Sequence, residues 1–144
     1  MIDLSLYSES GPVRLSDIAK RQKISLPYLE QIFSKLRRAG LVKSVRGPGG
    51  GYRLGRDASE ISAGEIVQAV EGSMDVSQCR GAAAWRGGAQ CLAHGLWSDL
   101  NAKMAEFLNS QSLKSIKERS LREHAHRAEM REQPIIVHIT EPKN

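Results

Sequence analysis

Apolar residues recur at helical spacing in two neighbouring segments near the start of the chain. The first segment begins at Leu15, and the second runs over residues 27–39. The apolar stripe of the second segment comprises Leu29, Ile32, Phe33 and Leu36. Ser25 precedes this segment as an N-cap residue, and Gly40 follows it as a residue that ends helices. The pattern predicts two short helices joined by a tight turn, which fits an ordinary helical hairpin and a helix-turn-helix equally well.

The segment that follows favours the helix-turn-helix. Residues 41–45 alternate as a strand does, and residues 52–54 form a second strand after a loop of glycine and proline. Arg46 stands at the tip of this loop, and Lys43 and Arg53 flank it. Glycines let the backbone approach a phosphate ridge, and an arginine at the tip can enter the minor groove. A nucleotide-binding loop would need a strand-to-helix context that is missing here. We therefore expect a β-hairpin wing.

Two further helices are predicted downstream of the wing. Ser62 and Glu65 have the S-x-x-E spacing of a capping box, and the helix that they open is expected to pack on the helix-turn-helix. The longest helix is expected from Trp97 to about Ile116. Its apolar stripe comprises Trp97, Leu100, Met104, Phe107 and Leu108. An amphipathic helix after a DNA-binding head predicts a two-fold dimer interface, so we expect a homodimer.

These elements predict a mainly α fold with a small β-hairpin wing, that is, a winged helix-turn-helix plus a long C-terminal dimerisation helix. We divide the chain into a DNA-binding domain at 1–72, a cysteine- and histidine-containing loop at 73–95, a dimerisation helix at 96–116 and a charged tail at 117–144. The mixed charges of the tail predict frayed helix followed by disorder.

Charge and composition point to the class of partner. The net charge is +5 and the isoelectric point is about 9.5, which favours an anionic partner and nucleic acid before membrane. No apolar run is long enough to span a bilayer, and the first residues do not resemble a signal peptide. We therefore expect a cytoplasmic protein that binds double-stranded DNA and no membrane.

Both cysteines lie in one glycine-rich segment together with a histidine. Cys79, Cys91 and His94 form the pattern C-x11-C-x2-H, which offers two thiolates and one imidazole. A closed zinc site or a [2Fe–2S] cluster needs four ligands, so these residues leave open a metal site or two unconnected thiols. Enzyme chemistry is not expected, because the chain has no C-x-x-C pair and no general base near either thiol.

Two stretches resemble the Rrf-type winged helix-turn-helix transcription regulators, and most closely their iron–sulfur cluster regulators. They are ISLPYLEQ at 24–31 and LVKSVRGPGGGY at 41–52, and the likeness extends over about 1–113. It implies a dimeric regulator of Fe–S assembly genes that holds a [2Fe–2S] cluster. It also implies that the second helix reads the major groove and the wing meets the minor groove. The expected DNA-binding residues are Ser25, Tyr28, Glu30, Gln31, Lys35, Arg46, Gly47, Pro48, Gly49, Gly50, Gly51 and Tyr52.

The resemblance also reveals a departure in the ligand pattern. Those regulators hold the cluster with C-x5-C-x5-C-x2-H, in which Cys79, Cys91 and His94 match the first, third and fourth positions. The second position is Trp85, which cannot ligate iron. Either an unusual ligand completes the site, or the cluster is labile, or it has been lost. A cluster-free regulator that acts through a protein or small-molecule partner is the alternative, followed by an Fe–S carrier or redox protein.

The start of the chain is a second departure. Members of the family begin about a dozen residues earlier, so Met1 falls inside their first helix. We expect the first helix of this chain to be short.

Overall fold

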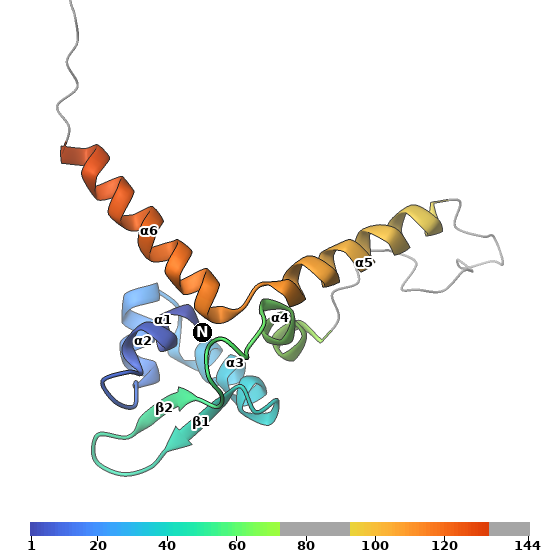
Figure 1. Ribbon diagram of the computed structural model, residues 1–144. Helices are drawn as coiled ribbons and strands as arrows, with labels where there is room; N and C mark the ends of the chain where they lie inside the picture. Colours follow the sequence, from blue (N-terminus) through green and yellow to red (C-terminus); the bar gives the residue numbers. More distant parts are fainter. Residues whose placement is uncertain (73–92, 133–144) are drawn as a thin grey trace, which may run out of the picture.

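The computed structural model describes residues 1–72 and 93–132. These residues form helices and one β-hairpin (Figure 1). The elements are α1 (Ile2–Tyr7), α2 (Leu15–Gln22), α3 (Leu26–Arg38), β1 (Val42–Val45), β2 (Gly51–Leu54), α4 (Ala63–Glu71), α5 (His94–Ser110) and α6 (Leu113–Glu132). This mainly helical architecture with a two-stranded wing confirms the expected fold class. Among the described helices, none combines the length and apolarity needed to cross a membrane.

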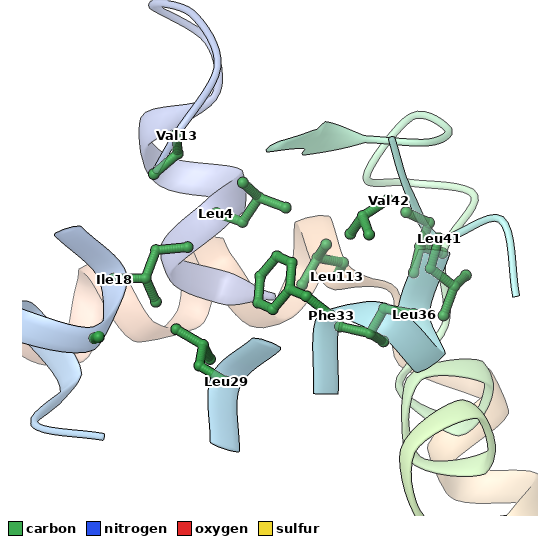
Figure 2. Close-up of a cluster of buried hydrophobic side chains, with 11 residues drawn as sticks. Leu4, Val13, Ile18, Leu29, Phe33, Leu36, Leu41, Val42 and Leu113 are labelled. Carbon is green, nitrogen blue, oxygen red and sulfur yellow. The ribbon is translucent and has the colours of Figure 1, made fainter. Parts of the chain in front are cut away.

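The hydrophobic core lies where α1, α2, α3 and the base of the wing meet (Figure 2). Phe33 is its centre and is 2% exposed. The predicted stripe of α3 is confirmed, since Leu29, Phe33 and Leu36 are buried and Ile32 is half-buried. The other buried apolar residues are Leu4, Val13, Ile18, Ala19, Leu41, Val42, Ile61 and Leu113. Burial of this stripe fixes which face of α3 remains outside.

The wing is an antiparallel hairpin in which Val42 pairs with Leu54 and Val45 with Gly51. A short third segment attaches it to the head, because Val13 and Tyr52 exchange two backbone hydrogen bonds of 2.9 and 2.7 Å. An isolated two-stranded hairpin is marginal in water. The bridge to Val13 and the buried side chain of Val42 therefore hold the wing in a defined position.

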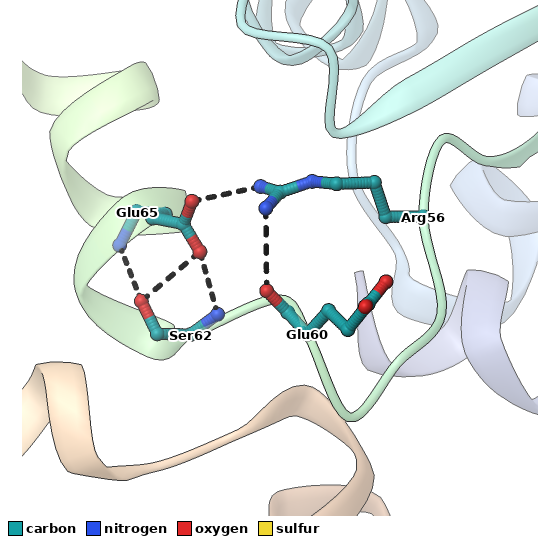
Figure 3. A network of polar contacts seen from close by, with 4 residues as sticks. All are labelled: Arg56, Glu60, Ser62 and Glu65. Atoms are coloured by element: carbon teal, nitrogen blue, oxygen red, sulfur yellow. Dashed lines mark hydrogen bonds and ion pairs between the residues drawn. The ribbon is translucent and has the colours of Figure 1, made fainter.

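Helix α4 begins with the predicted capping box (Figure 3). The Ser62 hydroxyl accepts from the Glu65 amide at 3.1 Å, and the Glu65 carboxylate accepts from the Ser62 amide at 2.9 Å. Arg56 donates to the other carboxylate oxygen at 2.7 Å. The backbone hydrogen bond from Ser62 and the guanidinium of Arg56 hold the pKa of Glu65 below its ordinary value. The apolar residues of α4 are half-buried against the core, as expected.

The expected single helix over 96–116 is wrong. The chain instead forms α5 and α6, which leave the head in different directions (Figure 1). The break lies at Gln111 and Ser112, where the backbone pairs with the segment before α4: Ala63 donates to Gln111 at 2.8 Å and Leu113 donates to Ile61 at 2.7 Å. Hydrogen bonds to another segment replace the helical ladder there, and Leu113 enters the core at 1% exposure.

The first part of the tail is helical, as expected, but the helix is regular and longer than a frayed end. Helix α6 extends to Glu132, so residues 117–132 are helical, and α6 rather than the predicted helix is the longest of those described. The expected tail beyond residue 132 and residues 73–92 of the expected loop lie outside the described residues.

Candidate nucleic-acid interface

Helices α2 and α3 form the helix-turn-helix. Lys23 caps the C-terminal end of α2 with a left-handed φ of 53°, and the Ile24 amide donates to the Ala19 carbonyl at 3.1 Å. Ser25 then adopts an extended conformation as the N-cap of α3, although its side chain makes no capping hydrogen bond. Ile24 packs against the core from within this turn. The turn thus fixes the direction in which α3 leaves α2.

The first turns of α3 present polar side chains away from the core. Tyr28 is 54% exposed, and Glu30 and Gln31 are exposed on the same helix. Glu30 and Gln31 form no hydrogen bond or ion pair with other described residues. Glutamine can bind an adenine edge through two hydrogen bonds, and a glutamate can accept from cytosine N4. This face can therefore read bases once it lies in a major groove.

Lys35, which was also expected at this surface, is engaged elsewhere. Its ammonium donates to the backbone carbonyl of Val70 at 2.8 Å, near the C-terminal end of α4. A cation is favourable there, because the last carbonyls of a helix carry partial negative charge. Lys35 thus follows Gln31 by one helical turn, but its ammonium is engaged by the end of α4.

The tip of the wing is open to solvent. Arg46, Gly47, Pro48 and Gly49 are exposed, whereas Gly50 is half-buried inside the loop. Gly50 donates to the Gly47 carbonyl at 2.9 Å, and a side chain at position 50 would collide with the backbone oxygens of Val45 and Gly47. Close packing of the loop on itself thus leaves Arg46 as the charged group at the tip.

Tyr52 connects the wing to α3. Its ring packs edge-on against Phe33 with 5.0 Å between the centroids, and it is half-buried. The half-buried Gly51 sits beside Val13, whose carbonyl a side chain at position 51 would strike. These two residues were expected among the DNA contacts. The structure places them where they set the position of the wing relative to α3.

Three cations of the wing are free of partners among the described residues. Lys43, Arg46 and Arg53 are exposed, and none forms an ion pair or hydrogen bond within that part of the chain. Two cations elsewhere in the head have acidic partners: Arg21 pairs with Asp3 at 2.6 Å and Arg56 with Glu65 at 2.7 Å. The wing therefore carries positive charge that the described protein does not neutralise.

His94 is the single expected cluster ligand within the described residues, since Cys79 and Cys91 lie outside them. It begins α5, and its Nδ1 is buried without a hydrogen-bond partner in the part of the chain that the structure describes. A buried imidazole nitrogen needs a partner, which a water, a metal ion or a residue outside the described part of the chain can supply. Two thiolates and an imidazole are donors that a [2Fe–2S] cluster accepts. Within 1–72 and 93–132, no three His, Cys, Asp or Glu side chains gather as a metal site.

The chain is similar to known proteins over most of its length. The family model of Rrf2, described as an iron-dependent transcriptional regulator, matches residues 1–119. The HTH-type transcriptional regulator IscR of Photobacterium profundum is 56% identical over 113 residues, which are 78% of this chain and 66% of that relative. The chain thus spans just under two-thirds of the length of this relative.

Solved structures agree with the family match. CymR (YrzC), the global cysteine regulator of B. subtilis, is similar with a TM-score of 0.68 and 34% identity, covering 81% of this chain and 86% of that chain. IscR of T. potens is similar with a TM-score of 0.64 and 34% identity, covering 92% of this chain and 82% of that chain. The chain therefore belongs to the Rrf2 family, with the winged-helix fold of its members.

Proposed function

We propose that this protein is a dimeric transcription regulator that binds double-stranded DNA, with α3 in the major groove and the wing at the adjacent minor groove. The observation that carries the proposal is the joint placement of two surfaces. The exposed polar side chains of α3 and the wing cations that have no partner among the described residues are linked through the contact of Tyr52 with Phe33. Bases are read by the first surface and phosphates are bound by the second.

Helix α5 supports the dimer. It has no buried residue, and large apolar side chains along it stand in solvent. These are Leu96, Trp97, Leu100 and Phe107, at 69%, 37%, 41% and 58% exposure. A second copy related by a two-fold axis would cover the same face on both subunits. Two heads would then address half-sites about one helical turn apart, as in other helix-turn-helix dimers.

Glu30 provides the test of base reading. Its carboxylate can accept from cytosine N4 and disfavours other bases, so Glu30→Ala should relax sequence discrimination while the wing maintains general affinity. The parent protein first selects duplexes from a random pool. The affinities of parent and mutant for these duplexes and for their single-base variants are then measured at one fixed salt concentration.

Glu118→Ala is the matched control, because Glu118 is an exposed acid on α6 without a partner among the described residues. Discrimination should be unchanged in this control. Equal discrimination in parent and Glu30→Ala would contradict the assignment of Glu30. A parent that prefers no selected duplex over random DNA would overturn the proposed function.

A second candidate activity is sensing of Fe–S status, with control of Fe–S assembly genes. The Nδ1 of His94, which has no partner among the described residues, favours it, together with the family's description as iron-dependent. Cys79, Cys91 and His94 would hold the group, and a [2Fe–2S] cluster would supply a redox-sensitive, oxygen-labile centre. Trp85 supplies no fourth ligand, so that ligand must come from outside the pattern. The alternative is a cluster-free regulator that acts through a protein or small-molecule partner.

Iron content distinguishes the two. The protein is purified and reconstituted without oxygen, and bound iron, bound sulfide and the visible spectrum are measured for the parent, His94→Ala and His124→Ala. Cluster sensing predicts about two irons per chain in the parent. The iron should be lost in His94→Ala and retained in His124→Ala, because His124 is exposed on α6. A colourless, iron-free parent that still binds selected DNA would favour the cluster-free regulator.

A further inference from the structure

We propose that Lys43 and Arg53 form a phosphate clamp on the outer face of the wing, separate from the arginine at its tip. The two side chains would hold one phosphate of the DNA backbone beside the minor groove that Arg46 enters. The inference rests on the proposed function, because it assumes that the ligand is duplex DNA. It assigns to the wing a second, sequence-independent contact.

The register of the hairpin brings the two cations together. Lys43 and Arg53 are directly paired residues of β1 and β2, so their side chains leave the same face of the hairpin. Val42 and Tyr52, one residue along on each strand, face the core. The β-carbons of a directly opposite antiparallel pair are about 5 Å apart. Both charged groups can therefore reach a single phosphate from two sides.

This pairing is unfavourable for the free protein. Like charges placed directly opposite one another destabilise a two-stranded sheet, and an acid in place of either residue would stabilise it. Neither cation has an acidic partner among the described residues. Asp57, the nearest acid along the chain, accepts hydrogen bonds from Ser59. Stability of the wing thus does not account for the pair, whereas an anion between the two charges would.

The position of the pair along the hairpin identifies the anion. Lys43 lies three residues from Arg46, which corresponds to about 10 Å along a strand. The minor groove is about 7.5 Å deep. When Arg46 enters that groove, the pair therefore comes level with the phosphates at its edge. A guanidinium and an ammonium also match a phosphate, because charged hydrogen bonds to its oxygens are short and strong.

The test measures the salt dependence of DNA binding by the full chain. Each phosphate that a protein neutralises contributes about −0.9 to the slope of log affinity against log salt. Lys43→Gln/Arg53→Gln should make the slope shallower by about 0.9 for each protomer, by the same amount on a selected duplex and on a random duplex. Arg119→Gln/Arg122→Gln is the control. It removes two exposed charges from α6, on the side of the molecule away from the wing (Figure 1), and should leave the slope unchanged.

Thermal unfolding separates a DNA contact from a structural role. The double variant should be at least as stable as the parent without DNA, because it relieves repulsion between the strands. A lower melting temperature would mean that the pair supports the wing itself and would overturn the clamp. A slope equal to that of the control would overturn it as well. A change of about 1.8 for each protomer would indicate two separate phosphates instead of one and would overturn the shared clamp.

The random duplex distinguishes failure of the clamp from failure of the proposed function. A parent that binds its selected duplex specifically, with a slope that the double variant does not alter, refutes the clamp alone. A parent without sequence preference refutes the proposed function, and the slope on the random duplex still decides whether the clamp binds phosphate.

Discussion

Asp3 carries a charge that is almost fully buried, and side chains of α2 compensate it. Its carboxylate is 7% exposed, and it accepts from Arg21 at 2.6 and 3.1 Å and from Gln22 at 2.9 Å. Arg21 also stacks over the Tyr7 ring at 4.0 Å. Burial raises the pKa of Asp3, but the hydrogen bonds from Arg21 and Gln22 and the charge of Arg21 together lower it by more, so the pKa lies below 3.8. This cluster fastens α1 to the helix-turn-helix.

Replacement of Asp3 by asparagine should destabilise the protein in a pH-dependent way. Because the pKa is depressed in the folded state, the carboxylate contributes stability above its unfolded pKa, and this contribution is lost as pH falls through the folded pKa. We expect Asp3→Asn to lower the free energy of unfolding by about 2 kcal/mol at neutral pH. The difference from the parent should shrink below pH 3.8. Urea denaturation across a pH series measures both effects.

Asp99→Asn is the control for this experiment, because Asp99 is exposed on α5. Its free energy of unfolding should follow that of the parent at every pH. A gap between parent and Asp3→Asn that persisted unchanged into strong acid would contradict the assignment to the carboxylate.

At the scale of elements, the segment around Ser62 determines three local structures. Ser62 caps α4 and pairs with Ser112 at the break between α5 and α6. Gly64, two residues later, lies where α5 crosses α4. A side chain at position 64 would displace the Asn109 side chain of α5 and lie 3.3 Å from its backbone nitrogen, so glycine favours this close approach. The direction of α5 therefore depends on a few residues at the start of α4.

Removal of the cap should weaken α4 more than the rest of the head. Ser62→Ala deletes the acceptor for the Glu65 amide, and a lost N-cap costs about 1 kcal/mol. The midpoint of chemical denaturation should fall accordingly, and amide exchange should increase first at the start of α4. Ser62→Thr keeps the hydroxyl and should remain close to the parent. An equal loss of stability in Ser62→Ala and Ser62→Thr would show that the missing capping hydrogen bond is not the cause of the destabilisation.

At the scale of the whole molecule, the head and α5 present two different surfaces. The head closes its own core with Leu113 and Ile61, at 1% and 0% exposure, and α5 projects from it (Figure 1). A folded chain rarely leaves large apolar side chains aligned along one helix in water. The proposed dimer accounts for this face.

A charge on this face should separate the subunits. Phe107→Glu would bury an unpaired carboxylate in the interface, which costs roughly 3 kcal/mol or more and weakens association by about 100-fold. Sedimentation equilibrium should show a shift from dimer to monomer, and the affinity for a two-half-site duplex should fall with it. Ala102→Glu adds the same charge on the opposite side of α5 and should leave the dimer intact. Dissociation by both variants, or by neither, would argue against this interface.

Local patterns in the chain were sufficient to predict the helix-turn-helix, the wing and the capped α4. Each depends on residues close in sequence: the helical stripe through Phe33, the glycines after Arg46, and the spacing of Ser62 and Glu65. The outward position of Tyr28, Glu30 and Gln31 also follows, because burial of one face of a helix exposes the other.

Tertiary structure alone decided the rest. Residues 96–116 have continuous helical periodicity, yet backbone pairing with residues 61–63 breaks the helix at Gln111, and the apolar Leu113 packs in the head. Likewise, Lys35 meets the end of α4, and Tyr52 meets Phe33. Periodicity records which residues prefer burial, but it does not specify the segment that covers them. That choice depends on contacts between residues far apart in the chain, which exist only once the core has formed.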